Sequence, residues 1–290
     1  MTSTMERLDK YRDQVQTKSG PASYIDTGGP GRVTLFVHGL GTSSYLWRHV
    51  IDQLDGQRRC VAVDLPLHGQ TPAAADQDFT LPGFARFLAE FCEGLELNDV
   101  DLVANDTGGA VSQVFATGHP ELLHTLTLTN CEAHDNLPPK VLLPAVWLAH
   151  MGLAARISPR LLRDIRRGRK RFYGLGYQDI ENLPEDLARF WLESQFATPE
   201  LARQNQRIMT SLHARDLLAI EPALARLQVP TLIVWGTGDK FFRLKWAYWL
   251  RDTIPGATEV VELSGARIFF PDERATELTA ALRRHWDAHP

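Results

Sequence analysis

The stretch that decides the fold is VDLVANDTGG, at residues 100–109. Its mostly apolar first half predicts a strand that is buried on both faces of a sheet. A glycine pair and the helical pattern of 110–118 follow at once, so the chain has to turn sharply from strand to helix. A turn of this kind exposes one side chain above the sheet, and here that side chain is Asp106.

The same strand-and-loop design recurs along the chain. Five further runs of apolar, β-branched residues that close on polar residues or glycine lie at 33–39, 58–69, 123–135, 230–239 and 258–265. Helical patterns, with apolar residues three and four positions apart, lie at 44–54, 81–95, 110–118, 244–254 and 273–286. This alternation predicts an α/β protein with a doubly wound, mostly parallel sheet.

One segment interrupts the alternation. Residues 136–216 contain no comparable strand and show helical patterns separated by proline and glycine. We predict a helical cap at 136–216, inserted into a core that is formed by 1–135 and 217–290. The cap should lie over the carboxyl ends of the strands, where open α/β sheets bind their ligands.

Composition sets the broad class of protein. The 290 residues include 31 Lys and Arg against 35 Asp and Glu, a net charge of -4, which argues against a general nucleic-acid binder. Three scattered cysteines are too few for a disulfide framework or a zinc cluster, so we expect no metal and a cytoplasmic location. No apolar run is long enough to span a bilayer, and residues 1–20 lack the apolar core of a signal peptide. We therefore expect neither secretion nor a membrane partner.

The order of the junctions resembles the α/β-hydrolase superfamily from Ala22 onward. HGLG at 38–41 is similar to its oxyanion loop, ANDTGG at 104–109 to its nucleophile elbow, and GTGD at 236–239 to the loop that bears its acidic triad member. Within the superfamily, the aspartate in the elbow and TSSYLWR at 42–48 resemble haloalkane dehalogenases and epoxide hydrolases.

This resemblance implies an enzyme without a cofactor. It implies Asp106 as nucleophile, Asp239 as the acidic member of the triad, and the backbone N–H groups of Leu40 and Thr107 as the oxyanion hole. A carboxylate is already ionised at neutral pH, so Asp106 needs a base only later, to activate the water that hydrolyses the covalent ester. The alternative is that Asp106 merely caps the following helix.

The sequence departs from the family pattern at the base. The stretch GARIFFPDE at 265–273 has Ile268 where the family has histidine, and an alkyl group cannot accept a proton. Leu40 and Thr107 also stand where dehalogenases carry side-chain donors to the halide. His134, just after the strand of 123–129, is the candidate replacement, with a structural role at the cap hinge as the alternative.

The remaining candidates surround this expected site. Without a histidine, Asp239 could pair with Arg267 or Lys240, approach Asp106 and raise the pKa of its carboxyl, or be a structural turn residue. Six further residues are expected to border the substrate: His38, Glu132, Trp147, Tyr173, Phe241 and Ile268.

Residues 156–171 contain eight Arg or Lys and the single acidic residue Asp164. This stretch predicts either a docking patch for an acidic partner, such as a carrier protein, or a solvated helix face.

Three functions remain open at this point. The first is an enzyme of hydrolase type, with Asp106 acting on a small to medium-sized apolar organic molecule. The second is a lyase, cyclase or isomerase that uses Asp106 as general acid or base. The third is a catalytically dead hydrolase fold that serves as a binding protein.

Overall fold

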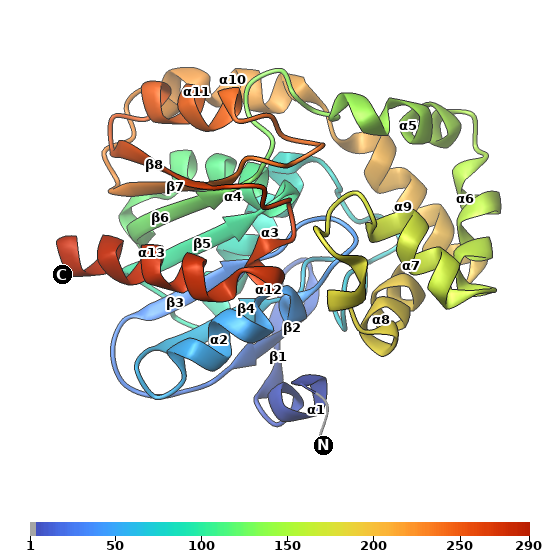
Figure 1. The fold of residues 1–290 in the computed structure, drawn as a ribbon, viewed down its shortest axis with the longest axis horizontal. Helices are drawn as coiled ribbons and strands as arrows, with labels where there is room; N and C mark the ends of the chain where they lie inside the picture. Colours follow the sequence, from blue (N-terminus) through green and yellow to red (C-terminus); the bar gives the residue numbers. More distant parts are fainter. Residues whose placement is uncertain (1–3) are drawn as a thin grey trace.

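Eight strands form one sheet in the order β1-β2-β4-β3-β5-β6-β7-β8 in the computed structural model, which describes residues 4–290 (Figure 1). The strands are β1 Arg12–Thr17, β2 Gly20–Asp26, β3 Val33–Val37, β4 Arg59–Val63, β5 Val100–Asn105, β6 Leu123–Thr129, β7 Thr231–Gly236 and β8 Ala257–Leu263. All pairs from β4 to β8 are parallel, whereas β1 and β2 pair antiparallel with their neighbours. The predicted α/β class with a mostly parallel sheet is confirmed.

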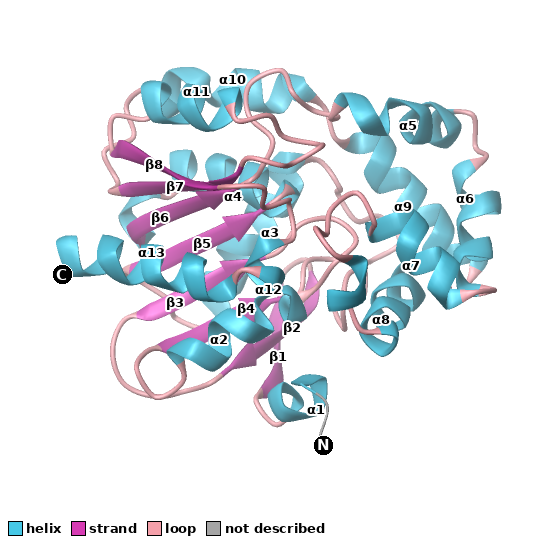
Figure 2. Cartoon of the chain, viewed as in Figure 1, coloured by secondary structure: helices cyan, strands magenta, loops and turns pink. Residues whose placement is uncertain are grey.

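Helices cover both faces of this sheet (Figure 2). The α-helices are α1 Thr4–Asp9, α2 Arg48–Leu54, α3 Leu81–Gly94, α4 Thr107–Gly118, α5 Leu143–His150, α6 Ala154–Ile157, α7 Ile165–Tyr173, α8 Glu185–Phe196, α9 Pro199–Ser211, α10 Ala214–Leu224, α11 Lys245–Thr253, α12 Phe270–Glu273 and α13 Ala275–Ala288. Short 3-10 helices are η1 Ser44–Trp47, η2 Pro120–Leu122, η3 Lys140–Leu142, η4 Ser158–Leu162 and η5 Ile180–Asn182. α2 and α13 lie over one face, and α3 and α4 lie over the other.

The hairpin of β1 and β2 has no counterpart in the sequence prediction. β1 reads RDQVQT and is the edge strand, so most of its side chains reach solvent and carry no apolar pattern. β5 and β7, in contrast, are buried along their whole length, as the apolar runs predict.

The segment between β6 and β7 is helical throughout, and α5 to α9 lie beyond the arrowheads of β5 to β7 (Figure 1). An inserted helical region therefore covers the carboxyl ends of the strands. The predicted boundary at 216 falls inside α10, which packs on α4 of the core. The division into 1–135, 136–216 and 217–290 stays a prediction.

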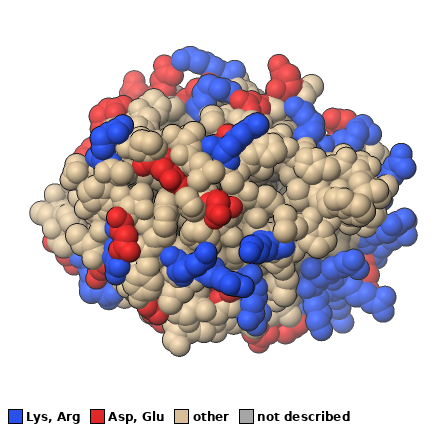
Figure 3. All heavy atoms as spheres, turned by 90° about the horizontal axis from the view of Figure 1, so that it is seen from above, with Lys and Arg blue, Asp and Glu red and all other residues tan. Residues whose placement is uncertain are grey.

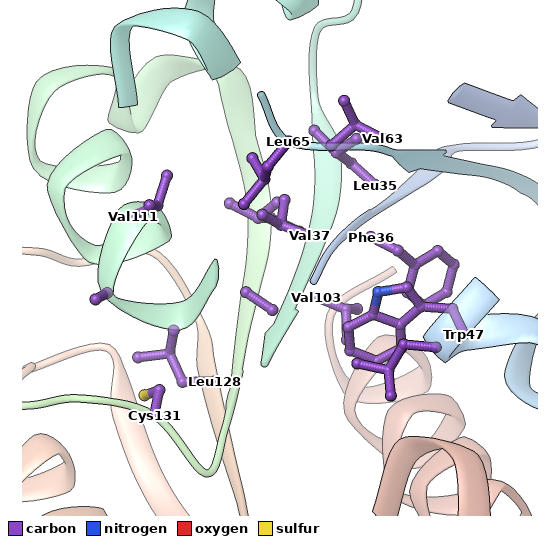
Figure 4. Packing of buried hydrophobic residues seen from close by; sticks show 14 of the residues in the cluster. Leu35, Phe36, Val37, Trp47, Val63, Leu65, Val103, Val111, Leu128 and Cys131 are labelled. Carbon is purple, nitrogen blue, oxygen red and sulfur yellow. The ribbon is translucent and has the colours of Figure 1, made fainter. Parts of the chain in front are cut away.

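The core beneath the site is packed from both faces of the sheet. Phe36 and Val103 lie toward Trp47, whereas Val37 lies toward α4 and Val111 (Figure 4). The rings of Phe36 and Trp47 are 5.0 Å apart, and all five side chains are fully buried. Each such burial stabilises the fold by about 1.5–3 kcal/mol, so the strand ends that carry the site rest on a rigid base.

Candidate active site

Asp106 occupies a strained turn between β5 and α4, as the sequence predicts. Its backbone has φ 56° and ψ -139°, a left-handed conformation that non-glycine residues adopt at a cost of about 1–3 kcal/mol. A Cβ atom on Gly108 would lie 2.3 Å from the carbonyl oxygen of His38, and one on Gly109 would lie 2.4 Å from the Cβ of Cys131. Only glycine lets the helix start this close to its neighbours, which explains the glycine pair.

Two backbone amides point at the Asp106 carboxylate. They are the N–H groups of Leu40 and Thr107, the pair expected to form an oxyanion hole. The elbow is also fixed by its own backbone, because the Asp106 N–H donates to the carbonyl of Asn130 at 3.0 Å. The geometry brings nucleophile candidate and amide donors together. Asp106 itself is half-buried, so solvent still reaches it.

Three carboxyl groups interact at this point of the molecule. Burial, together with the charges of Glu132 and Asp239, raises the pKa of Asp106 well above its ordinary value. Burial raises the pKa of Glu132 to about 7, although a hydrogen bond from Thr107 opposes the shift. Because neighbouring carboxylates repel one another, the three groups cannot all be ionised without cost, and their proximity favours the protonated form of each.

Glu132 is the buried member of this group. Its Oε1 accepts a hydrogen bond of 2.8 Å from the Thr107 hydroxyl, directly beside the elbow. Its Oε2 is buried and has no hydrogen-bond partner among residues 4–290. A buried polar atom without a partner costs about 1–3 kcal/mol, which makes this oxygen a strong acceptor for a proton, a water or a substrate group.

Asp239 is held by amides. Its Oδ2 accepts from the Asn130 side chain at 2.9 Å, and its Oδ1 accepts from the N–H groups of Phe241 at 2.5 Å and Phe242 at 2.9 Å. Burial raises the pKa of Asp239 to about 6. Asp239 forms no ion pair within 4.0 Å in the described chain, although the charge of Arg267 opposes the rise of its pKa, and its own charge raises the pKa of Asp106. Of the open alternatives, an Asp239 that approaches Asp106 fits best.

Phe241 therefore binds Asp239 through its backbone N–H group, and its half-buried ring lies beside that of Phe242. Asn130, which is not among the predicted site residues, ties β6 to β7 and to Asp239 through its amide. The sequence feature that could have identified Asn130 as a site residue is its position directly after a buried strand.

Ile268, at the position where the sequence resemblance implies a base, is buried in apolar packing. Its carbonyl accepts a hydrogen bond of 3.0 Å from the Asn105 side chain, at the end of β5. A Cβ on Gly176 of the inserted region would lie 2.8 Å from the Ile268 side chain. Position 268, where the sequence predicts no proton acceptor, is thus also a point of close contact between the core and the inserted region.

His134 lies at the edge of the sheet, but its ring has other partners. Nδ1 contacts the Glu221 carboxylate on α10, and the ring stacks 5.1 Å from Trp249 and 5.9 Å from Trp246 on α11. These contacts fit the hinge alternative, because the imidazole would have to leave Glu221 to serve Asp106. The catalytic role of His134 stays a prediction.

Three residues expected to touch substrate have different surroundings. His38 is fully buried, its Nε2 accepts from the Leu65 N–H at 3.0 Å, and Nδ1 therefore donates to the Gly39 carbonyl at 2.7 Å. Burial lowers the pKa of His38, so a neutral imidazole braces the loop that holds Leu40. Because both ring nitrogens have partners, His38 is placed to brace this loop, and its expected role in substrate binding stays a prediction.

The Tyr173 hydroxyl is also occupied. It is fully buried and donates to the Gly41 carbonyl at 2.7 Å, which joins α7 to the loop after β3. Trp147 lies on α5 with 63% of its surface exposed, facing solvent and not the elbow group. Neither placement fits the expected substrate contact. Residue type and position in the sequence do not reveal the direction of a side chain, and the substrate contacts of both residues stay a prediction.

Comparison with known proteins agrees with this architecture. The family model described as alpha/beta hydrolase fold matches residues 33–273, so the chain belongs to the α/β hydrolase fold family. A haloalkane dehalogenase of Agrobacterium fabrum is 28% identical over 89% of this chain and 86% of the relative. A pimeloyl-[acyl-carrier protein] methyl ester esterase of Aeromonas hydrophila is 26% identical over 92% of this chain and 94% of the relative. 

Among solved structures, the epoxide hydrolase CorEH superposes with a TM-score of 0.78 at 18% identity, covering 96% of this chain and 98% of that one. At this identity the likeness shows the fold alone. Relatives with three different reactions share the architecture, so the reaction has to be argued from the site.

Proposed function

We propose that this chain is a cofactor-independent enzyme of the haloalkane dehalogenase and epoxide hydrolase type, acting through Asp106 on a small to medium-sized apolar organic substrate. The observation that carries the proposal is the strained elbow, which holds the Asp106 carboxylate against the amides of Leu40 and Thr107. Strain of this kind persists only where the surrounding structure enforces it, and it gathers at functional sites.

In the proposed first step, an Asp106 oxygen attacks an sp3 carbon of the substrate. A C–O bond forms as the bond to the leaving group breaks, and the leaving group departs with the electron pair. The product is an ester of Asp106. In the second step water adds to the ester carbonyl, and the Leu40 and Thr107 amides stabilise the oxyanion that develops.

The second step needs a proton acceptor, and we assign this role to Glu132. It is bonded to Thr107 beside the elbow, its Oε2 has no partner among the described residues, and its pKa of about 7 leaves it partly ionised at neutral pH. It would take the proton of the attacking water and return it to the alcohol that leaves when the ester bond breaks.

A second candidate function is non-hydrolytic. Burial and two neighbouring carboxyls raise the pKa of Asp106, and Ile268 replaces the base that hydrolysis would normally use. Both observations favour a carboxyl that exchanges a proton with the substrate, as a lyase, cyclase or isomerase would require.

One experiment separates the two candidates. The protein is incubated with alkyl halides, epoxides and esters in water enriched in the heavy oxygen isotope, and the peptide that contains Asp106 is weighed by mass spectrometry. Label in the Asp106 carboxylate shows a complete hydrolytic cycle, and a trapped adduct shows attack without hydrolysis. Product without label or adduct supports the acid-base candidate. Absence of product, adduct and label across all three substrate classes contradicts the proposal.

The Glu132→Gln variant tests the assigned base in the same assay. Glutamine keeps the shape and can still accept from Thr107, but it cannot take a proton. We expect adduct to accumulate in this variant and label to be lost. The Glu259→Gln variant, on the exposed side of β8, is the matched control and should behave as the wild type. Unchanged label in the Glu132→Gln variant contradicts the role of Glu132.

A further inference from the structure

The inserted region exposes large apolar side chains on one helix face. Leu143, Trp147 and Met151 are four positions apart on α5 and at its C-cap, and 50%, 63% and 52% of their surfaces are exposed. Across residues 4–290, the strongly exposed large apolar side chains all fall between Val141 and Leu218, within or next to the insertion. A spacing of four positions places the three side chains side by side.

The flank of this face is basic and lacks counter-charges. No acidic residue lies between Asp135 and Asp164 in the sequence. Arg156, Arg160 and Arg163 are exposed, and none of them forms an ion pair with any residue that the structure describes. α6, which carries Arg156, contacts both α5 and η4. Figure 3 shows blue side chains gathered beside a tan surface at the right-hand end of the molecule, where the insertion lies.

The rest of the basic stretch is partly neutralised. Arg169 is buried and bonds Glu181 at 2.8 Å, and Arg166 bonds Glu185 at 2.7 Å. Arg167 lies 3.2 Å from Asp164. Lys170 and Arg171 also form no ion pair with a described residue, so positive charge without a carboxylate partner lies at 156–163 and at 170–171. The first of these stretches contains α6, which contacts α5 and its exposed apolar face.

We propose that α5, α6 and η4 form a docking surface for an anionic lipid bilayer. Leu143, Trp147 and Met151 would enter the boundary between head groups and acyl chains, and Arg156, Arg160 and Arg163 would contact the negative head groups. Tryptophan favours this boundary because its ring is apolar and its N–H is polar. The expectation of no membrane partner rested on the absence of an apolar run long enough to span a bilayer, and that criterion does not detect a surface contact.

The geometry fits a surface contact. Within the described chain no single helix is long and apolar enough to cross a membrane, and the pair 140–150 and 154–162, which passes by length and composition together, is bent by 92°. A bend of this size interrupts the pair, so the two parts do not form one straight span. An acidic protein would be attracted by the same arginines, but it would not by itself explain three exposed apolar side chains in register.

The test uses the full chain and vesicle flotation. Vesicles of phosphatidylcholine mixed with phosphatidylglycerol should bind the protein, vesicles of phosphatidylcholine alone should bind it far less, and added salt should weaken the binding. The Trp147→Gln variant should lose affinity on the order of tenfold, whereas Trp147→Phe should keep it. The Trp147→Phe variant should also lose most of the tryptophan fluorescence shift on binding.

The charge is tested by a matched pair of variants. Arg160→Gln should weaken binding by about fivefold, the share of one basic side chain near an anionic surface. Arg284→Gln removes an exposed charge on α13, whose C-terminal end lies at the opposite end of the molecule from α5, and should change nothing (Figure 1). All substitutions are at exposed positions, and circular dichroism checks that the fold is kept.

Three outcomes would overturn the proposal. The first is absence of binding to the mixed vesicles, or binding that Trp147→Gln and Arg160→Gln leave unchanged. The second is salt-sensitive binding to polyglutamate without binding to vesicles, which would assign the surface to an acidic protein. The third is a stable dimer that Trp147→Gln dissociates, which would assign it to a second copy of this chain. None of these results bears on Asp106, because no substrate is used.

Discussion

The elbow at Asp106 and the loop at 265–273 belong to the same site, yet they differ in what they retain. The elbow keeps a left-handed aspartate, close-packed glycines and two amides directed at the carboxylate. The loop contacts the end of β5 through Asn105, and Ile268, at the position where the sequence resemblance implies a base, is buried and apolar. One half of the candidate site is thus defined by backbone geometry, and the other half by an apolar side chain.

This difference indicates that the elbow and the loop at 265–273 depend on different features of the sequence. The elbow depends on packing that allows only glycine, so a single substitution there would disturb the core. The loop can exchange a histidine for an apolar residue and still pack against the insertion. Beside Asp106, Glu132 and Asp239 are two carboxyl groups whose pKa values are raised, so they are the candidates for proton transfer at the elbow.

The largest effect should follow a change at the elbow. Asp106→Asn removes the nucleophilic carboxylate, and asparagine tolerates the left-handed backbone. We expect formation of the covalent adduct to fall by a factor on the order of 10⁴. The measurement is the single-turnover rate for the best substrate found in the isotope assay.

Asp164→Asn is the control for this change. Asp164 is exposed and caps α7, and asparagine is an equally good helix cap. This control should keep the wild-type rate and stability. Full activity in the Asp106→Asn variant would show that the elbow residue is not the reacting group.

Glu132 should make stability depend on pH. Burial raises the pKa of Glu132 from 4.5 to about 7, so the folded protein binds more protons than the unfolded chain between these values. The free energy of unfolding should therefore fall as the pH rises through this window, by roughly 3 kcal/mol for an isolated group. Urea unfolding at both ends of the window measures it.

The Glu132→Gln variant should reduce this slope, because glutamine does not titrate, while Asp106, Asp239 and Asp272, whose pKa values are also raised, keep the rest of it. Glu259→Gln at an exposed position of β8 should leave the slope as it is. A slope that remains unchanged in the Glu132→Gln variant would show that its carboxyl is ionised in the folded state throughout this range.

The sequence predicts the elbow well and the surroundings of its candidate residues poorly, for a physical reason. Asp106, its glycines and the strand before it form a local pattern whose geometry follows from sterics. The partners of His134 and Tyr173 are Glu221 and Gly41, which lie 87 and 132 positions away in the chain. A local sequence pattern cannot predict contacts between residues that are so far apart in the chain. They depend on how the insertion lies on the core.

The polar edge strand β1 illustrates the same limit. It is held by pairing with β2 rather than by an apolar pattern, and the burial of its residues alternates only weakly. Strand signals in a single sequence come from burial, so an exposed edge strand gives almost none.

The next largest effect should follow the introduction of a histidine at position 268. Ile268→His places an imidazole on the loop that lies beside Asn105, where it could act as base. We expect release of the Asp106 ester to accelerate by about a hundredfold, with some loss of stability because a polar ring replaces a buried alkyl group. Ile268→Val keeps the site apolar and should not accelerate release. Equal release rates in the folded histidine and valine variants would argue that this place no longer faces the ester.

The smallest expected effect concerns the bond between the insertion and the loop that carries Leu40. Tyr173→Phe removes the hydroxyl that donates to the Gly41 carbonyl at 2.7 Å. We expect a loss of about 1–2 kcal/mol in the free energy of unfolding, since a buried acceptor loses its partner, with little change in KM. Tyr248→Phe, whose hydroxyl contacts Glu262 at the surface, should cost far less. A large rise in KM without loss of stability would instead show that Tyr173 touches the substrate, because a hydroxyl that only braces the loop acts on folding first.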